Sequence, residues 1–89
     1  MINQLKSKDS SVRRSAVEAI GVLRDEKAVE YVIAALKDDD RFVRQEAAMA
    51  LAKIGGVRAL ESMTQALAEE KNEFVRDFIQ KAIGRLQPE

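Results

Sequence analysis

The sequence repeats itself about every 31 residues, and this period constrains the fold more than any single residue does. The pair Val12-Arg13 recurs as Val43-Arg44 and again as Val75-Arg76. A repeat of this length is typical of one helical supersecondary unit that stacks on copies of itself. The period therefore predicts a solenoid of stacked helices.

Each unit begins with a helix whose small and apolar residues follow one stripe. An Asx residue (Asp9, Asp40 or Asn72) precedes each helix, and its short side chain can accept hydrogen bonds from the first turn. Counted from the valine of each pair, the stripe occupies positions i, i+4, i+7, i+8 and i+11, which is one face of a helix. The three stripes are Val12, Ala16, Ala19, Ile20 and Leu23; Val43, Ala47, Ala50, Leu51 and Ile54; and Val75, Ile79, Ala82, Ile83 and Leu86.

A second helix follows the first in each unit. The pattern predicts one from about Glu26 to Lys37, capped by Asp25, and one from about Val57 to Glu69 after the break at Gly55-Gly56. Residues 2–6 are interpreted as the tail of a preceding second helix. The chain is thus expected to consist of helices in antiparallel pairs.

The middle unit resembles a HEAT repeat, and more narrowly the short HEAT-like repeat named after the phycobilisome lyases. The matching run is Leu36-Lys-Asp-Asp-Asp-Arg-Phe-Val43-Arg44-Gln-Glu-Ala47-Ala48-Met-Ala50-Leu51-Ala-Lys-Ile54-Gly55. The resemblance implies an all-α fold, a short right-handed α-solenoid of antiparallel helix pairs with about 2.5 repeats. It covers nearly the whole chain, in two good copies and a weaker third. Residues 1–89 are therefore expected to form a single domain, with units at about 5–35, 36–66 and 67–87.

Charge and composition restrict the partners. Lys plus Arg equals Asp plus Glu, at 15 each, so net charge draws the chain neither to nucleic acid nor to a membrane surface. No apolar run approaches the roughly 20 residues that span a bilayer. The start Met1-Ile2-Asn3-Gln4 lacks the pattern of a signal peptide. A cytoplasmic location is the expectation by elimination.

The sequence contains neither histidine nor cysteine. The commonest general base and the strongest common nucleophile are therefore missing. The iron-binding branch of the HEAT-like families uses His-Glu pairs, which this chain cannot supply. The acidic run Asp38-Asp39-Asp40 lacks the spacing of a calcium loop, and capping with an Arg44 partner explains it. We expect no enzyme activity, no cofactor and no metal site.

Arg13, Arg44 and Arg76 recur at one position of the repeat. The family resemblance implies that they connect neighbouring repeats, through Asp residues or backbone carbonyls of the turns between them. A guanidinium suits this role because it donates several hydrogen bonds in a fixed geometry. The alternative is an anion-binding site at the helix N-termini.

In the HEAT-like family the second helices line the concave side of the solenoid, so their exposed residues are candidates for protein binding. Tyr31 is the single tyrosine, a residue type enriched in interfaces, and the alternative for it is a ring packed between helices. The outward-facing candidates are Lys27, Glu30, Tyr31 and Ala34 in one unit and Arg58, Glu61, Ser62 and Gln65 in the next.

The third unit departs from the repeat at Phe78, which stands where the earlier units have Ser15 and Glu46, on the expected solvent face. Phe74 precedes it by one helical turn, so the two rings form an i, i+4 pair. They either cover the open end of the stack or form an apolar patch for a second copy or another protein. In the homodimer alternative, Phe78→Glu converts a dimer to a monomer on a sizing column.

The pattern as a whole favours a non-enzymatic scaffold that binds protein through its concave helix face or its open ends. The alternative is an accessory subunit or module of an enzyme, such as a bilin-lyase-type chromophore-attachment factor, which the resemblance alone suggests. Nucleic-acid binding ranks below both, because Lys27, Lys37 and Arg58 are matched by acidic residues on the same helices.

Overall fold

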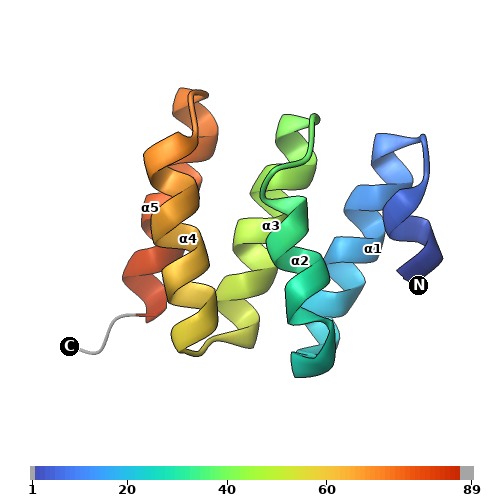
Figure 1. Ribbon diagram of the computed structural model, residues 1–89, viewed down its shortest axis with the longest axis horizontal. Coiled ribbons are helices and arrows are strands. Elements are labelled where there is room, and N and C mark those ends of the chain that lie inside the picture. The colour runs from blue at the N-terminus through green and yellow to red at the C-terminus, as the bar shows by residue number, and fades with distance from the viewer. Residues whose placement is uncertain (1, 87–89) are drawn as a thin grey trace.

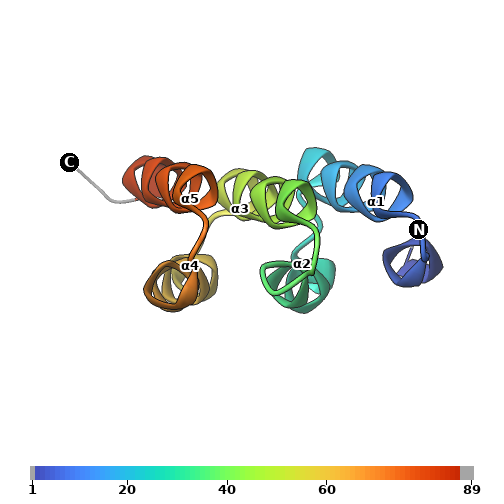
Figure 2. The same cartoon turned by 90° about the horizontal axis from the view of Figure 1, so that it is seen from above.

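The computed structural model describes residues 2–86 of the chain. They form helices and no strand. The elements are η1 (Ile2–Lys6), α1 (Ser10–Leu23), η2 (Glu26–Ala28), α2 (Val29–Ala35), α3 (Arg41–Ile54), α4 (Val57–Glu69) and α5 (Glu73–Leu86). Helices α1, α3 and α5 lie side by side in one layer, and α2 and α4 lie in a second layer with η1 (Figures 1 and 2). The expected all-α repeat solenoid is confirmed.

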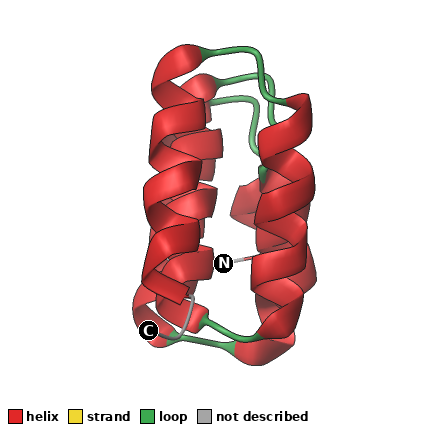
Figure 3. Cartoon of the chain, turned by 90° about the vertical axis from the view of Figure 1, so that its left-hand side faces the viewer, coloured by secondary structure: helices red, strands yellow, loops and turns green. Residues whose placement is uncertain are grey.

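The predicted N-caps are confirmed at all three units. Asp9, Asp40 and Asn72 each accept a hydrogen bond from the backbone N–H two residues later, at 2.9, 2.8 and 2.9 Å. The helices they begin run parallel in one layer, and the loops gather at the two ends of the molecule (Figure 3). An Asx residue that satisfies free N–H groups thus fixes where each layer helix starts.

The second helix of the middle unit has the predicted bounds, whereas that of the first unit is divided. Asp25 accepts from the N–H of Lys27 at 3.0 Å and begins the 3-10 turn η2, after which α2 continues as an α-helix to Ala35. The segment 2–6 is a 3-10 helix. Both η2 and α2 still face the core, through the buried side chains of Ala28 and Val32 respectively.

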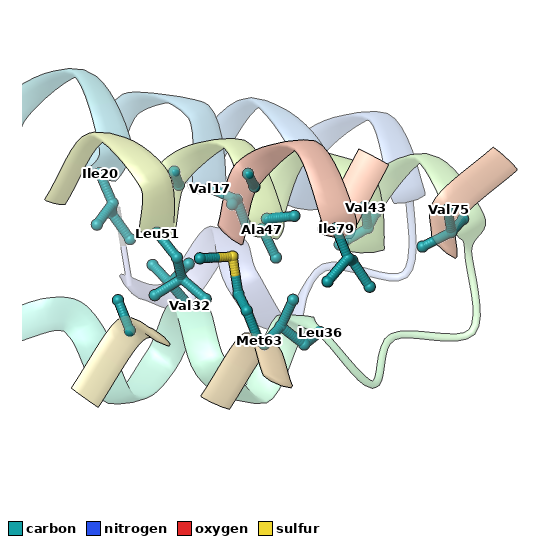
Figure 4. Close-up of a cluster of buried hydrophobic side chains, with 14 of the residues drawn as sticks. Val17, Ile20, Val32, Leu36, Val43, Ala47, Leu51, Met63, Val75 and Ile79 are labelled. Carbon is teal, nitrogen blue, oxygen red and sulfur yellow. The ribbon is translucent and has the colours of Figure 1, made fainter. Parts of the chain in front are cut away.

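The core lies between the two layers and consists of aliphatic side chains and Met63 (Figure 4). Ile20, Leu51 and Ile79 of the three stripes are fully buried there. The prediction for Leu23 is wrong, because its side chain is 65% exposed. Leu23 is the last residue of α1, and the chain turns away at once through Arg24, whose φ of 51° is left-handed.

Helices α1 and α3 approach closely at Gly21. A Cβ atom at Gly21 would lie 2.8 Å from both the Cα and the Cβ of Ala50, closer than such atoms pack. Glycine is therefore required here by the contact between two helix backbones. The same position of the repeat is occupied by Ala52, 31 residues after Gly21, and by Gly84, a further 32 residues along the chain.

The glycine contact predicts opposite effects for two Gly→Ala substitutions in helices. Gly21→Ala lowers the free energy of unfolding by about 1–3 kcal/mol, because the added methyl overpacks the interface. Gly84→Ala is the matched control: its Cβ meets nothing within 4 Å, so alanine's helix propensity raises stability by up to about 1 kcal/mol. Urea unfolding measures both. Equal effects of the two substitutions would contradict the close approach of α1 and α3.

Glu46 is buried, contrary to the expectation that its position faces solvent. It is 9% exposed and lies on the side of α3 that faces α1. Burial raises the pKa of its carboxyl, and so does Glu18, whereas Lys53 and Arg14 act in the opposite direction. The expectation failed because this repeat position faces the preceding helix of the layer, where one is present.

The raised pKa of Glu46 predicts a pH-dependent gain from Glu46→Gln. The folded state disfavours the carboxylate, so its charge costs stability as the pH rises above the ordinary value of 4.5 and through the raised pKa. The variant is then more stable than the wild type at neutral pH. Well below pH 4.5, where the carboxyl is neutral in folded and unfolded chains, this gain disappears. Thermal unfolding across this range checks it, and a pH-independent difference would refute the assignment.

Candidate binding groove

A groove separates α2 from α4 in the second layer, with a volume of about 750 Å³. The layer helices α1, α3 and α5 lie next to one another, whereas α2 and α4 stand apart (Figure 2). Ile33 of α2, Leu36 directly after this helix and Ala66 of α4 give the groove an apolar lining, and Lys37 and Gln65 are exposed at its sides. We call this surface the inner groove.

One end of the inner groove is bridged by an ion pair between α4 and α2. The Nε of Arg58 donates to Glu30 Oε2 at 2.9 Å, and its Nη2 donates to Oε1 at 3.0 Å. The hydrogen bond from Arg58 lowers the pKa of Glu30. Both side chains are more than half exposed, so the pair contributes little to stability. Its two charges can therefore exchange partners at small cost.

Ser62 lies under this ion pair and does not face outward as predicted. It is 5% exposed, and its hydroxyl donates to the carbonyl oxygen of Arg58 at 2.8 Å. The Nη1 of Arg58 in turn donates to the Ser62 Oγ at 3.2 Å. The side chain thus forms part of the groove wall and orients the guanidinium above it.

The other end of the inner groove contains a partly buried arginine, Arg44. Its Nε and Nη2 donate to the two carboxylate oxygens of Glu70 at 2.8 and 3.3 Å. Its Nη1 donates to the carbonyl oxygens of Asp38 and Asp39 at 2.7 and 3.1 Å. One side chain therefore joins the turn before α3 to the turn before α5.

Arg13 repeats the full arrangement, and Arg76 repeats its contacts with backbone carbonyls. Arg13 donates to both carboxylate oxygens of Asp38, at 2.9 and 3.0 Å, and to the carbonyl of Ser7 at 2.7 Å. Arg76 donates to the carbonyls of Leu67 and Glu70 at 2.7 and 3.0 Å. These contacts match the implied link between repeats. The carboxylates already occupy the guanidinium forks of Arg13 and Arg44, so an added anion would have to displace them.

The acidic run differs in detail from the expectation. The Asp38 carboxylate pairs with Arg13 and not with Arg44, and Asp40 caps α3. Among residues 2–86, no group of three or more acidic side chains is placed to hold a metal ion.

The predicted protein-binding residues divide between several surfaces. Arg58, Ser62 and Gln65 line the inner groove, and Glu30 joins it through Arg58. The other second-layer candidates are exposed outside it: Lys27, Tyr31, Ala34 and Glu61. Helical spacing places Tyr31, which is 44% exposed, on the side of α2 away from α4. The half-buried Ile33 was missed; its place one turn after Glu30 on α2 was the available signal.

Phe74 and Phe78 belong to the first layer and do not cover the end of the stack. Phe78 lines a small hollow together with Met49 and Ala52 of α3, so it lies on the side of α5 that faces α3. Phe74 is 69% exposed one turn earlier. Phe78 shares the repeat position of buried Glu46, which faces the preceding layer helix in the same way.

Comparison with known proteins agrees with this architecture. A model of HEAT repeats matches residues 1–84. The chain belongs to the HEAT repeat family. It is also 32% identical over 87 residues to the bilin biosynthesis protein MpeU of Synechococcus sp. (strain WH8020). That alignment covers 97% of the chain and 29% of MpeU, so the chain spans less than a third of that relative's length.

Within residues 2–86, no helix is both long and apolar enough to cross a membrane.

The two groove-end arginines predict different stability effects. Arg44→Ala leaves the Glu70 carboxylate, 7% exposed, without its guanidinium, and two turn carbonyls without their donor. We expect a loss of about 2 kcal/mol or more in the free energy of unfolding. Arg58→Ala is the control, and it changes stability little because its pair lies in water. Equal losses of stability in urea unfolding would contradict the larger contribution of Arg44.

Proposed function

We propose that this HEAT repeat protein is a non-enzymatic adaptor whose inner groove binds a segment of a partner protein. The observation that carries the proposal is the groove itself, about 750 Å³ between α2 and α4, with an apolar lining and charged ends. A concave surface that combines apolar contact area with a few polar groups is what a specific binding site requires. The absence of histidine and cysteine from the sequence adds support for a binding role.

The charges of the groove favour a protein partner over a phosphate backbone. Arg58 is paired with Glu30 at one end, and Arg44 with Glu70 at the other. A nucleic-acid groove requires uncompensated Lys and Arg, because binding energy comes from phosphate neutralisation. The exposed Arg58–Glu30 pair can instead open and form complementary pairs with both signs of charge on a polypeptide.

A second candidate function is supported by the relative. MpeU is described as a bilin biosynthesis protein, and its similarity to this chain supports an accessory role in chromophore attachment. In that case the inner groove would hold part of a larger enzyme or its protein substrate. The cytoplasmic location and the homodimer stay predictions under both functions.

Site-specific photo-crosslinking in cells tests the proposal. A benzophenone amino acid replaces Gln65, which is exposed in the inner groove, and in a matched variant it replaces Ser15, exposed on α1. We expect a discrete protein adduct from position 65 and none from position 15, identified by mass spectrometry. The Gln65 adduct should weaken when Arg58→Glu reverses the charge at the groove end.

Two outcomes would count against the adaptor role. Adducts of equal yield from positions 65 and 15 would show contact without a specific site. A bilin that copurifies with the chain, detected by its visible absorbance, would favour the chromophore-related function.

A further inference from the structure

The junction between α3 and α5 is looser than the junction between α1 and α3. At the first junction Gly21 lets the backbones meet, with a would-be Cβ only 2.8 Å from Ala50. At the second junction the equivalent residues are Ala52 and Ala82. The methyl of Ala52 occupies the space that Gly21 leaves free, so α5 cannot approach α3 as closely. A hollow lined by both alanines remains between the two helices.

This hollow, which we call the outer groove, has a volume of about 210 Å³. Met49, Phe78 and the two alanines form its apolar lining, and its charged lining residues, Lys81 and Arg85, are both basic. Its volume lies below the roughly 300 Å³ at which sites for drug-sized ligands begin. The outer groove therefore fits one or two apolar side chains, with cations beside them.

The apolar surface continues along α5 beyond the hollow. Phe74 lies one turn from Phe78, and the guanidinium of Arg41 is 5.7 Å from the centroid of its ring. The same guanidinium is 4.7 Å from the ring of Phe42, which is 45% exposed. Aromatic rings with an arginine between them form a second apolar and cationic contact point. The two contact points lie on the same pair of helices, α3 and α5.

The far side of α5 is different in character. Gln80 occupies the repeat position at which Val17 and Ala48 are fully buried against the next layer helix. Gln80 itself is exposed. That side of α5 therefore lacks the apolar contact of the earlier units. The exposed apolar surface of this helix faces α3, at the outer groove.

We propose that the outer groove is a second docking site, for an acidic amphipathic segment of a partner protein. Large apolar side chains of that segment enter the hollow beside Met49 and Phe78, and its carboxylates pair with Lys81 and Arg85. The exposed Asp77–Lys81 pair is no obstacle, because an ion pair in water is weak and Lys81 can change partners. The proposal does not depend on the inner groove.

Fluorescence anisotropy with the full chain tests this docking site. The probe is a labelled helical peptide with leucines on one face and glutamates on the other. Two further probes replace the glutamates with lysines or the leucines with serines. We expect binding of the acidic amphipathic probe alone, with an affinity that falls as ionic strength rises. Equal binding of the lysine probe would overturn the proposed charge complementarity.

Variants of the chain locate the binding. Phe78→Ser introduces the residue type of Ser15 at the equivalent position and should weaken binding at least about tenfold. The double variant Lys81→Gln with Arg85→Gln changes exposed side chains, and should remove most of the salt dependence. Arg58→Gln, in the inner groove, is the matched control and should leave the affinity unchanged. Unchanged affinity in Phe78→Ser would overturn the proposal.

Sedimentation of the chain alone tests whether a second copy of the chain occupies the outer groove. The chain itself exposes Val22 and Leu23, 63% and 65% exposed, just before Asp25 and Glu26. If the chain self-associates, and both Leu23→Ser and Phe78→Ser abolish that association, the outer groove belongs to a second copy and the partner-protein proposal is wrong. A monomer at high concentration that binds the acidic probe supports it. Because Gln65 lies in the inner groove, its crosslinking result is independent of this outcome.

Discussion

The arginine links between turns are the interaction on which the rest of the structure depends. The single side chain of Arg44 contacts both the turn before α3 and the carboxylate of Glu70 in the turn before α5. Arg13 makes the corresponding pair of contacts, and Arg76 donates to the carbonyl oxygens of Leu67 and Glu70. These links lie in the turns where the layer helices begin. The carbonyl groups of these turns would otherwise lack hydrogen-bond donors. The links join the turns of neighbouring repeats and so hold the layer helices in register.

Both grooves lie where neighbouring helices of one layer are incompletely packed against each other. The first layer is closed between α1 and α3 because Gly21 accepts Ala50, and it is partly open between α3 and α5 because Ala52 stands in the glycine's place. The second layer is open between α2 and α4, with the exposed Arg58–Glu30 pair as its bridge. Open positions in an otherwise packed solenoid leave apolar side chains accessible, which is the physical requirement for binding.

The period predicted the elements well because capping and burial are local to a helix. Asp9, Asp40 and Asn72 could be recognised by residue type and position, and the bounds of α4 followed from its apolar spacing and from Gly55-Gly56. The inner groove was predicted only in part. Arg58 and Gln65 could be placed by helical spacing, but the burial of Ser62 depends on its contact with the Arg58 carbonyl.

The error at Glu46 has a tertiary cause. Its repeat position faces the neighbouring helix α1 of the layer, so its burial depends on packing between helices. Among residues 2–86 no layer helix lies on that side of α1, and Ser15 is exposed, whereas Glu46 faces α1. An alignment of repeats treats the two positions as equivalent although their neighbours differ. The outer groove could not be foreseen for the same reason.

The central claim is that a protein partner binds between α2 and α4. Hydrogen–deuterium exchange of the chain, with and without the partner recovered through Gln65, tests it most directly. The account predicts slower exchange in the amides of α2 and α4 on binding, and unchanged exchange in α1. Slower exchange confined to α1 and α5, with α2 and α4 unaffected, would contradict it.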